Sequence, residues 1–223
     1  MEVYRKGVII IGIPVLILGQ SGSGKSTSLR NFNEKEVGVF NVAGKPLPFR
    51  SKIKTFNTSD YDLIAKTLVA NKSKCYVIDD SQYLMAFEQV AKAKEIGFAK
   101  YTDMGLHFMN LIRCIQNHTS EDTIVYFLHH TERNEDGHIK AKTVGKMIDN
   151  WVTLEGLFSI VLLAWTDGKK YKFITQSDGN TPCKSPMEMF PLEIDNDLKY
   201  VDTTIREYYG LTNNNNTKNG KED

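Results

Sequence analysis

Short apolar runs recur along this sequence, and polar or turn-forming segments separate them. An unbroken run of β-branched and aliphatic residues is typical of a strand that is buried on both faces of a parallel sheet. Five core strands are predicted in this way, at 15–18, 37–42, 75–80, 123–128 and 159–165. The alternating segment 169–175 follows the turn signal Asp167-Gly168 and predicts an antiparallel edge strand. Shorter strands are expected at 7–12 and 54–57.

Segments with apolar residues at helical spacing lie between the predicted strands. Helices are expected at 28–32, from residue 59 with Ser59 as its N-cap, at 81–96 with Ser81 as its cap, at 102–117 and at 201–209. Strands that alternate with helices predict a three-layer α/β fold. We expect a mostly parallel five-strand core sheet with a C-terminal antiparallel hairpin.

Length and composition favour one domain. The chain of 223 residues has enough apolar content for one core, which is expected over 1–210. Residues 211–223, with four consecutive asparagines, are expected to form a disordered polar tail. A formal net charge of +1 gives no global attraction to nucleic acid, so any polyanion site must be a local patch. Three widely spaced cysteines argue against a disulfide framework or a zinc site and for a reducing compartment.

The apolar N-terminal segment imitates an export signal, because Arg5 and Lys6 precede it. Gly12 and Pro14 interrupt the apolar run, and no small-residue cleavage site follows. No later run is long enough to cross a bilayer. We therefore expect no membrane association and a cytoplasmic location.

The segment after the first core strand matches the nucleotide-binding pattern G-x-x-x-x-G-K-[ST] at every position. Its residues are Gly19, Gln20, Ser21, Gly22, Ser23, Gly24, Lys25, Ser26 and Thr27. The glycines let backbone amides turn towards phosphate, and the following helix adds its first amides and positive dipole end. Lys25 is expected to contact the β- and γ-phosphates of ATP, and the Ser26 hydroxyl to bind Mg²⁺. The alternative is a glycine- and serine-rich connection without a ligand, which would not require the Lys-Ser pair.

Two carboxylates end the third core strand, at Asp79 and Asp80. Ligands of parallel sheets bind at the carboxyl ends of the strands, so Asp79 is expected to hold Mg²⁺ through water. Asp80 is expected to orient the water molecule that attacks ATP. The alternative is that both residues simply end a strand at a turn.

Two histidines end the fourth core strand, where His129 is a candidate catalytic sensor of the γ-phosphate. For either His129 or His130, the alternative is a place in a surface loop or a half-buried cap. A metal pair is not expected, because adjacent strand residues point to opposite faces. The segment 130–140 contains an Asp-Gly turn and predicts an exposed hairpin or mobile loop.

Three lysines follow, at Lys140, Lys142 and Lys146. One interpretation is that a lysine, Lys146 before the others, reaches the ATP site of a neighbouring subunit and stabilises transition-state charge. The other interpretations are contact with nucleic-acid phosphates and a solvated basic face.

Several motifs together resemble a family of small phage-encoded ATPases that consist of a RecA-like core alone. They are 19–26 (GQSGSGKS), 76–80 (YVIDD), 127–132 (FLHHTE), 143–147 (TVGKM), 155–156 (EG) and 184–186 (KSP). The resemblance extends to about residue 210. It implies a RecA-like P-loop fold, Mg²⁺ and ATP bound between the subunits of a ring or filament, and a role in phage DNA recombination or replication. It also implies single-stranded DNA and a phage single-strand-binding or annealing protein as partners.

The chain departs from recombinase RecA at the end of the second core strand, where Asn41-Val42 stand in place of a glutamate. Asp80 or the region of Glu132 is therefore the candidate for activating water. DNA contact is expected in the basic loop after this strand, at Lys45, Arg50 and Lys52, with Phe49 available to stack on bases.

Two other classes of protein remain open as alternatives. A small-molecule kinase of the P-loop type has a similar size, but here the lid segment 133–142 holds one arginine where such kinases carry several. A nucleotide-dependent binding or regulatory module with little turnover is the other alternative. ATP hydrolysis, measured with and without single-stranded DNA, separates these functions.

Overall fold

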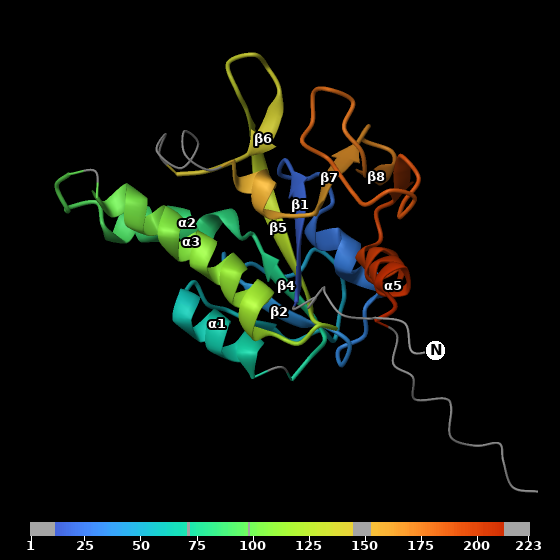
Figure 1. The fold of residues 1–223 in the computed structure, drawn as a ribbon, viewed down its shortest axis with the longest axis horizontal. Helices are drawn as coiled ribbons and strands as arrows, with labels where there is room; N and C mark the ends of the chain where they lie inside the picture. The colour runs from blue at the N-terminus through green and yellow to red at the C-terminus, as the bar shows by residue number, and fades with distance from the viewer. Residues whose placement is uncertain (1–11, 71, 98, 145–152, 212–223) are drawn as a thin grey trace, which may run out of the picture.

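One sheet organises the chain in the computed structural model, which describes residues 12–70, 72–97, 99–144 and 153–211 (Figure 1). Its strands are β1 (Ile13–Gly19), β2 (Gly38–Asn41), β3 (Thr55–Phe56), β4 (Cys75–Asp79), β5 (Ile124–Arg133), β6 (Ile139–Ala141), β7 (Ile160–Thr166), β8 (Tyr171–Ile174) and β9 (Glu193–Asp195). Their order is β3-β2-β4-β5-β1-β7-β8-β9, and β6 pairs with β5. The pairings from β3 to β7 are parallel, and those of β6, β8 and β9 are antiparallel. The predicted α/β class with a mostly parallel sheet is therefore confirmed.

The two faces of the sheet carry separate apolar clusters, because side chains alternate along a strand. In β1, Leu16 and Leu18 join the cluster that packs with α1 (Tyr61–Val69), α2 (Gln82–Ala91) and α3 (Ala99–His118). Val15 and Ile17 join the cluster that packs with η1 (Ser26–Asn31) and α5 (Leu198–Tyr209). Figure 1 shows α1, α2 and α3 on one side of the sheet and α5 on the other. The short 3₁₀ helix η2 (Leu154–Leu157) precedes β7.

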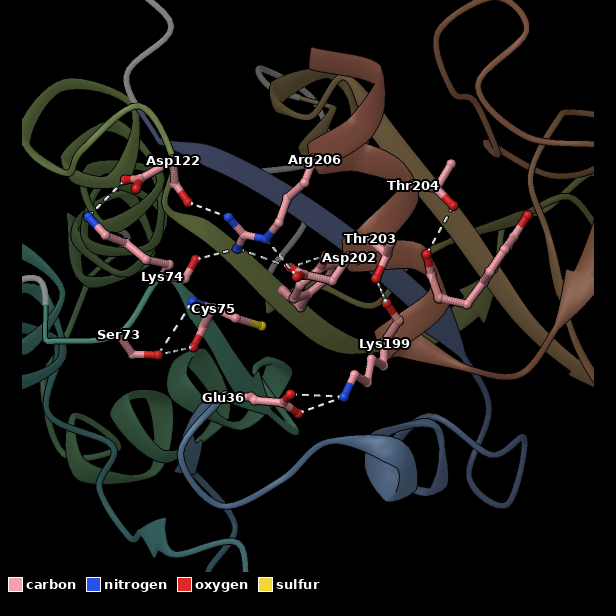
Figure 2. Close-up of polar contacts among 12 residues, drawn as sticks. Glu36, Ser73, Lys74, Cys75, Asp122, Lys199, Asp202, Thr203, Thr204 and Arg206 are labelled. Carbon is pink, nitrogen blue, oxygen red and sulfur yellow. Dashed lines mark hydrogen bonds and ion pairs between the residues drawn. The ribbon is translucent and has the colours of Figure 1, made fainter. Parts of the chain in front are cut away.

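A polar cluster fastens α5 to the sheet (Figure 2). Arg206 donates to the backbone carbonyl oxygens of Lys74 and Asp122 at 2.7 and 2.8 Å, and its Nε donates to the Asp202 carboxylate at 2.7 Å. The hydroxyl of the fully buried Tyr126 on β5 donates to Asp202 at 3.0 Å. One end of α5 is therefore tied to the segments that enter β4 and β5.

The carboxyl ends of β1 and β4 lie at one edge of the sheet, on either side of β5. Leu18 and Gly19 of β1 lie opposite His129 and His130 of β5 in the parallel register. On the other side of β5, Ile78 of β4 lies opposite Phe127. The segments that follow β1 and β4 are therefore neighbours in space, with the second half of β5 between them.

Two strand predictions differ from the structure. The fourth core strand does not end at the histidines, because β5 continues to Arg133 and pairs with β6 in the predicted hairpin. Gly137 has a φ of 84° in the turn of this hairpin, a backbone angle that suits glycine. The strand at 169–175 is β8, but it is not the edge of the sheet, because β9 pairs with its free side.

The helix boundaries also differ. The helix after the glycine-rich segment is the six-residue 3₁₀ helix η1, because Phe32 turns to extended backbone. Asp60 rather than Ser59 caps α1, since its carboxylate accepts from the amides of Asp62 and Leu63. Ser81 makes no cap hydrogen bond to α2, and α2 ends at Ala91 because Ile96 is fully exposed and buries nothing.

Three predictions fall wholly or almost wholly outside the described residues, namely the strand at 7–12, the catalytic Lys146 and the polar tail at 211–223. Among the helices of the described part of the chain, none is both long and apolar enough to cross a membrane.

Candidate functional site

A cleft of about 380 Å³ lies at the edge of the sheet where β1 and β4 end. Its lining combines the glycine-rich segment with residues from four other places in the chain. These are Lys45, Pro46 and Pro48 after β2, Asp79 and Asp80 at the end of β4, His130 of β5 and Tyr171 of β8. Residues far apart in the sequence are therefore brought together around the segment 19–27.

The glycine-rich segment needs glycine at two positions for different reasons. Gly24 has a φ of 92°, and a Cβ there would lie 2.8 Å from the ring of Tyr171. At Gly19 a Cβ would lie 2.3 Å from the Ser23 hydroxyl oxygen, so the segment folds closely on itself. The Ser23 hydroxyl is buried and has no hydrogen-bond partner among the described residues. The unpaired Ser23 hydroxyl therefore lies next to Gly24, whose backbone angle favours glycine.

Lys25 is buried at the base of this segment. Its ammonium group donates to the carbonyl oxygens of Gly19 and Gln20 at 2.7 and 2.8 Å. Burial lowers the pKa of Lys25 to about 8, although Asp80 and Asp79 oppose the shift by attraction. The structure therefore holds a desolvated ammonium group in the same cleft as the two carboxylates.

Ser26 and Asp79 meet although 53 residues separate them in the sequence. The Ser26 hydroxyl donates to the Asp79 carboxylate at 2.8 Å. Burial raises the pKa of Asp79, and the hydrogen bond from Ser26 only partly offsets this effect. Within the described residues no group of three His, Cys, Asp or Glu side chains forms a metal site. A hydroxyl and one carboxylate nevertheless fit Mg²⁺, because this ion takes one or two protein oxygens and completes its shell with water and phosphate.

Asp80 is held by two partners in a strained backbone conformation. Its φ of 59° lies in the left-handed region, which aspartate tolerates better than most residues. Its carboxylate pairs with the Lys45 ammonium at 2.6 Å and with Nε2 of His130 at 3.1 Å. Burial alone would raise the pKa of Asp80, but the hydrogen bonds from His130 and Lys45 outweigh it and lower the pKa to about 2. Asp80 is therefore a fixed anion in the cleft.

His129, the histidine that the sequence favoured as the sensor, does not line the cleft. Its ring is fully buried, 5.8 Å from the ring of Phe108 on α3. Its two nitrogens lie 2.9 Å from the Ser81 hydroxyl and 2.8 Å from the Lys142 carbonyl oxygen. His130, one residue later, faces the cleft instead. The geometry therefore favours His130 as the histidine that meets a ligand.

The lysines after β5 lie away from the cleft as far as the structure describes them. Lys140 pairs with Glu132 across the β5–β6 hairpin at 3.0 Å, and the side chain of Lys142 is exposed. Glu132, the alternative water-activating residue, is likewise occupied in this hairpin. The positions of Lys140 and Lys142 within one chain do not test whether a lysine acts on a neighbouring subunit, so that role stays a prediction.

The basic loop after β2 divides between the cleft and the surface. Lys45 was expected to contact DNA but lines the cleft, whereas Arg50 and Lys52 are exposed. Phe49, expected to stack on bases, is partly buried against the cluster beneath α5. Of the residues expected to contact DNA, Arg50 and Lys52 are therefore the exposed cations that lie outside the cleft.

The sequence did not predict the places of three polar side chains of the cleft: Lys45 as a partner of Asp80, His130 as the inward-facing histidine, and Tyr171. Because side chains alternate along a strand, the sequence predicted that the two histidines point to opposite faces, but not which of them faces the cleft. Comparison with protein-family models and with curated proteins finds nothing that matches this sequence. The functional assignment therefore rests on the motifs and on the geometry of this cleft.

Proposed function

We propose that this chain is a Mg²⁺-dependent ATPase of the RecA-like P-loop class and that the phosphates of ATP bind in the cleft. One observation carries the proposal: Lys25, Ser26 and Asp79 lie together in one cleft, with Ser26 and Asp79 in direct contact across 53 residues of sequence. A structural loop would not require a buried lysine, a serine hydroxyl and a strand-end carboxylate at one place. The glycine conformations and the unpaired Ser23 hydroxyl support a polyanion as the ligand.

The residues around the cleft have separate tasks in this proposal. Lys25 exchanges its carbonyl partners for phosphate oxygens, since an ammonium group binds a phosphate more strongly than it binds neutral carbonyls. Ser26 and Asp79 would hold Mg²⁺, which when bound would supply positive charge to the phosphate oxygens. Asp80 accepts a hydrogen bond from the attacking water. By accepting this hydrogen bond, Asp80 orients the water for attack on the terminal phosphate.

Hydrolysis joins the oxygen of water to the terminal phosphorus of ATP. The bond between that phosphorus and its bridging oxygen breaks, and the electron pair stays on ADP. One proton of the water stays on inorganic phosphate as its hydroxyl group, and the other is released to solvent. The contribution of the protein is position and charge, as is general for phosphoryl transfer.

The RecA-like class is supported by the place of β5. This strand lies between β1 and β4 and brings His130 to the cleft, as expected of a sensor strand, with the inward histidine at 130 rather than 129. A role in phage DNA recombination or replication, with single-stranded DNA and an annealing or single-strand-binding partner, rests on the sequence resemblance. The same is true of ATP bound between the subunits of a homo-oligomer.

The test is phosphate release from ATP by the full chain, with and without Mg²⁺ and single-stranded DNA. We expect Mg²⁺-dependent release of inorganic phosphate, and a loss of at least about 10²-fold in turnover for Lys25→Ala. Asp79→Asn is the second variant, which should weaken ATP binding in the presence of Mg²⁺ more than in its absence. Lys199→Gln is the matched control, because this lysine pairs with Glu36 at 2.8 Å outside the cleft.

Each alternative function predicts a different result. Transfer of phosphate to an added small-molecule acceptor without phosphate release would identify a kinase. Tight binding without turnover would identify a binding module. Full activity of a correctly folded Lys25→Ala variant would overturn the assignment of the cleft.

A further inference from the structure

Lys45 is held at the mouth of the cleft by its backbone. The side-chain amide of Asn41, the last residue of β2, donates to the Lys45 carbonyl oxygen at 2.7 Å. Asn41 is buried, and it lies opposite Asp79 in the pairing of β2 with β4. Gly44, with a φ of 67°, turns the chain just before Lys45. The position of Lys45 is therefore set by the same strands that position Asp79.

The side chain of Lys45 reaches from this anchor to Asp80. Its Nζ lies 2.6 Å from Oδ2 of Asp80 and 5.5 Å from the centre of the Tyr83 ring. Yet 61% of the Lys45 side chain is exposed to solvent. An exposed four-carbon stem moves easily between partners, because little packing opposes its rotation. The backbone of Lys45 is therefore fixed, whereas its ammonium group can move from Asp80 to another partner.

The charges in the cleft favour such an exchange when a triphosphate enters. Lys25 and Lys45 supply the two ammonium groups of the lining, and Asp79 and Asp80 supply two carboxylates. Lys25 donates to the carbonyl oxygens of the glycine-rich segment, whereas Lys45 belongs to the loop after β2 and pairs with Asp80. A phosphate group carries more charge and more acceptor oxygens than one carboxylate oxygen, so it competes well for Lys45. A terminal phosphate beside Asp80 would also repel that carboxylate unless a cation lay between them.

We propose that Lys45 acts within its own subunit as the cation for the terminal phosphate, leaving Asp80 when a nucleoside triphosphate binds. This inference rests on the proposed function and deepens it. His130 retains its hydrogen bond to Asp80 in the exchange. Oδ2 of Asp80, released by Lys45, is then the acceptor for the attacking water. Without nucleotide, Lys45 occupies this acceptor, so Asp80 gains its role only when a terminal phosphate draws Lys45 away.

A binding experiment tests the contact with the terminal phosphate directly. The full chain and its Lys45→Gln variant are titrated with ADP and with an ATP analogue that has nitrogen in place of the last bridging oxygen. We expect ADP affinity within about twofold of the wild type and a loss of about tenfold for the triphosphate analogue. Lys199→Gln should change neither affinity. An equal loss for both nucleotides, or no loss for the analogue, would overturn the proposal.

Turnover and mixing separate this inference from the proposed function. Lys45→Gln should lower turnover at saturating ATP by about 10²-fold, and Lys45→Arg should restore part of it. Asp80→Asn should leave triphosphate binding intact and slow hydrolysis.

If Lys25→Ala loses activity while Lys45→Gln retains it, the ATPase assignment stands and the proposed role of Lys45 is wrong. If a mixture of Lys45→Gln and Lys25→Ala proteins regains activity, Lys45 acts on a neighbouring subunit, and the inference is wrong. If Lys25→Ala also stays fully active, the proposed function is wrong, and the role of Lys45 that rests on it is wrong as well.

Discussion

His129 and His130 are neighbours in β5 with opposite surroundings. His130 meets Asp80 at the cleft, whereas His129 is fully buried beside α3. A carbonyl oxygen only accepts, so Nε2 of His129 donates to Lys142, and Nδ1 accepts from the Ser81 hydroxyl. Burial lowers the pKa of His129 from 6.5 to about 4, the hydrogen bond to Lys142 opposes this, and His130 and Lys25 add to it. The folded protein therefore keeps this imidazole neutral.

Stability should consequently fall in mild acid. Between pH 6.5 and about 4 the unfolded chain binds a proton at His129 that the folded chain does not bind. The neutral His129 thus contributes to the free energy of unfolding above pH 6.5, and this contribution is lost as the pH falls. The free energy of unfolding should decrease by about 2 kcal/mol between about pH 7 and about pH 5. Urea unfolding at the two pH values measures this difference. His129→Gln should remove most of it, and His118→Gln, at an exposed position on α3, should not. An unchanged pH dependence in His129→Gln would contradict the interpretation.

Among the elements, α5 supports the site without lining the cleft. Its N-terminal end adjoins η1, the helix that begins with Ser26: Arg30 donates to the Asn196 carbonyl oxygen at 2.5 Å, and Asn31 donates to the Asp197 carboxylate at 2.7 Å. The rest of α5 is tied to the far edge of the sheet by Arg206 (Figure 2). Helix α5 thus connects η1, which follows the carboxyl end of β1, to the segments that enter β4 and β5 at the opposite edge of the sheet.

Removal of Arg206 should therefore destabilise the fold more than it impairs the cleft. Arg206→Ala leaves the buried Asp202 carboxylate without its cation and the Asp122 carbonyl oxygen without the Arg206 donor, whereas the Lys74 carbonyl oxygen keeps the amide of Ile124. We expect a loss of about 2 kcal/mol in the free energy of unfolding, because the guanidinium is partly exposed and the pair is not fully desolvated. Chemical denaturation measures the loss. Arg113→Ala, at an exposed position on α3, should change stability by less than about 0.5 kcal/mol. Equal effects of the two substitutions would show that the cluster contributes nothing specific.

At the scale of the whole molecule, the loop after β2 connects the cleft to an exposed basic surface. Lys45 contacts Asp80, and Arg50 and Lys52 lie exposed a few residues further along the same loop. The proposed ATPase activity and the proposed DNA contact therefore share one short segment of chain.

Single-stranded DNA should bind through that loop with strong salt dependence. Replacing Arg50 and Lys52 by glutamine should weaken binding to a labelled oligothymidine in fluorescence anisotropy. For two lost phosphate contacts, the slope of log K against log salt should become shallower by about 1.4. Lys169→Gln with Lys170→Gln is the matched control, because both lysines are exposed in the turn between β7 and β8. A control pair that weakens binding as much, or a slope that does not change, would argue against this surface.

Local patterns in the sequence determined the core strands and those residues of the site that are contiguous along the chain. Runs such as 75–80 and 123–128 predict buried strands because burial on both faces leaves no room for polar side chains, and β4 and β5 follow these runs closely. The pattern at 19–27 likewise identified Lys25 and Ser26, since the backbone turn and the residues that follow it are contiguous. The end of β5 could not be predicted in this way, because β6 extends it from outside.

Only the tertiary structure decided which distant residues share the cleft. Alternation along β5 separates His129 from His130, but the packing of α3 on one face determines that His129 is the buried one. Lys45 reaches Asp80 because the Asn41 amide fixes the loop after β2, and nothing in the spacing of these residues encodes that path. Tyr171 lies over Gly24 because β8 returns antiparallel to β7. The sequence by itself thus determined the residues of the glycine-rich segment and of the strand end. Their partners depended on strand order and loop path, since these arise from contacts between segments that are distant along the chain.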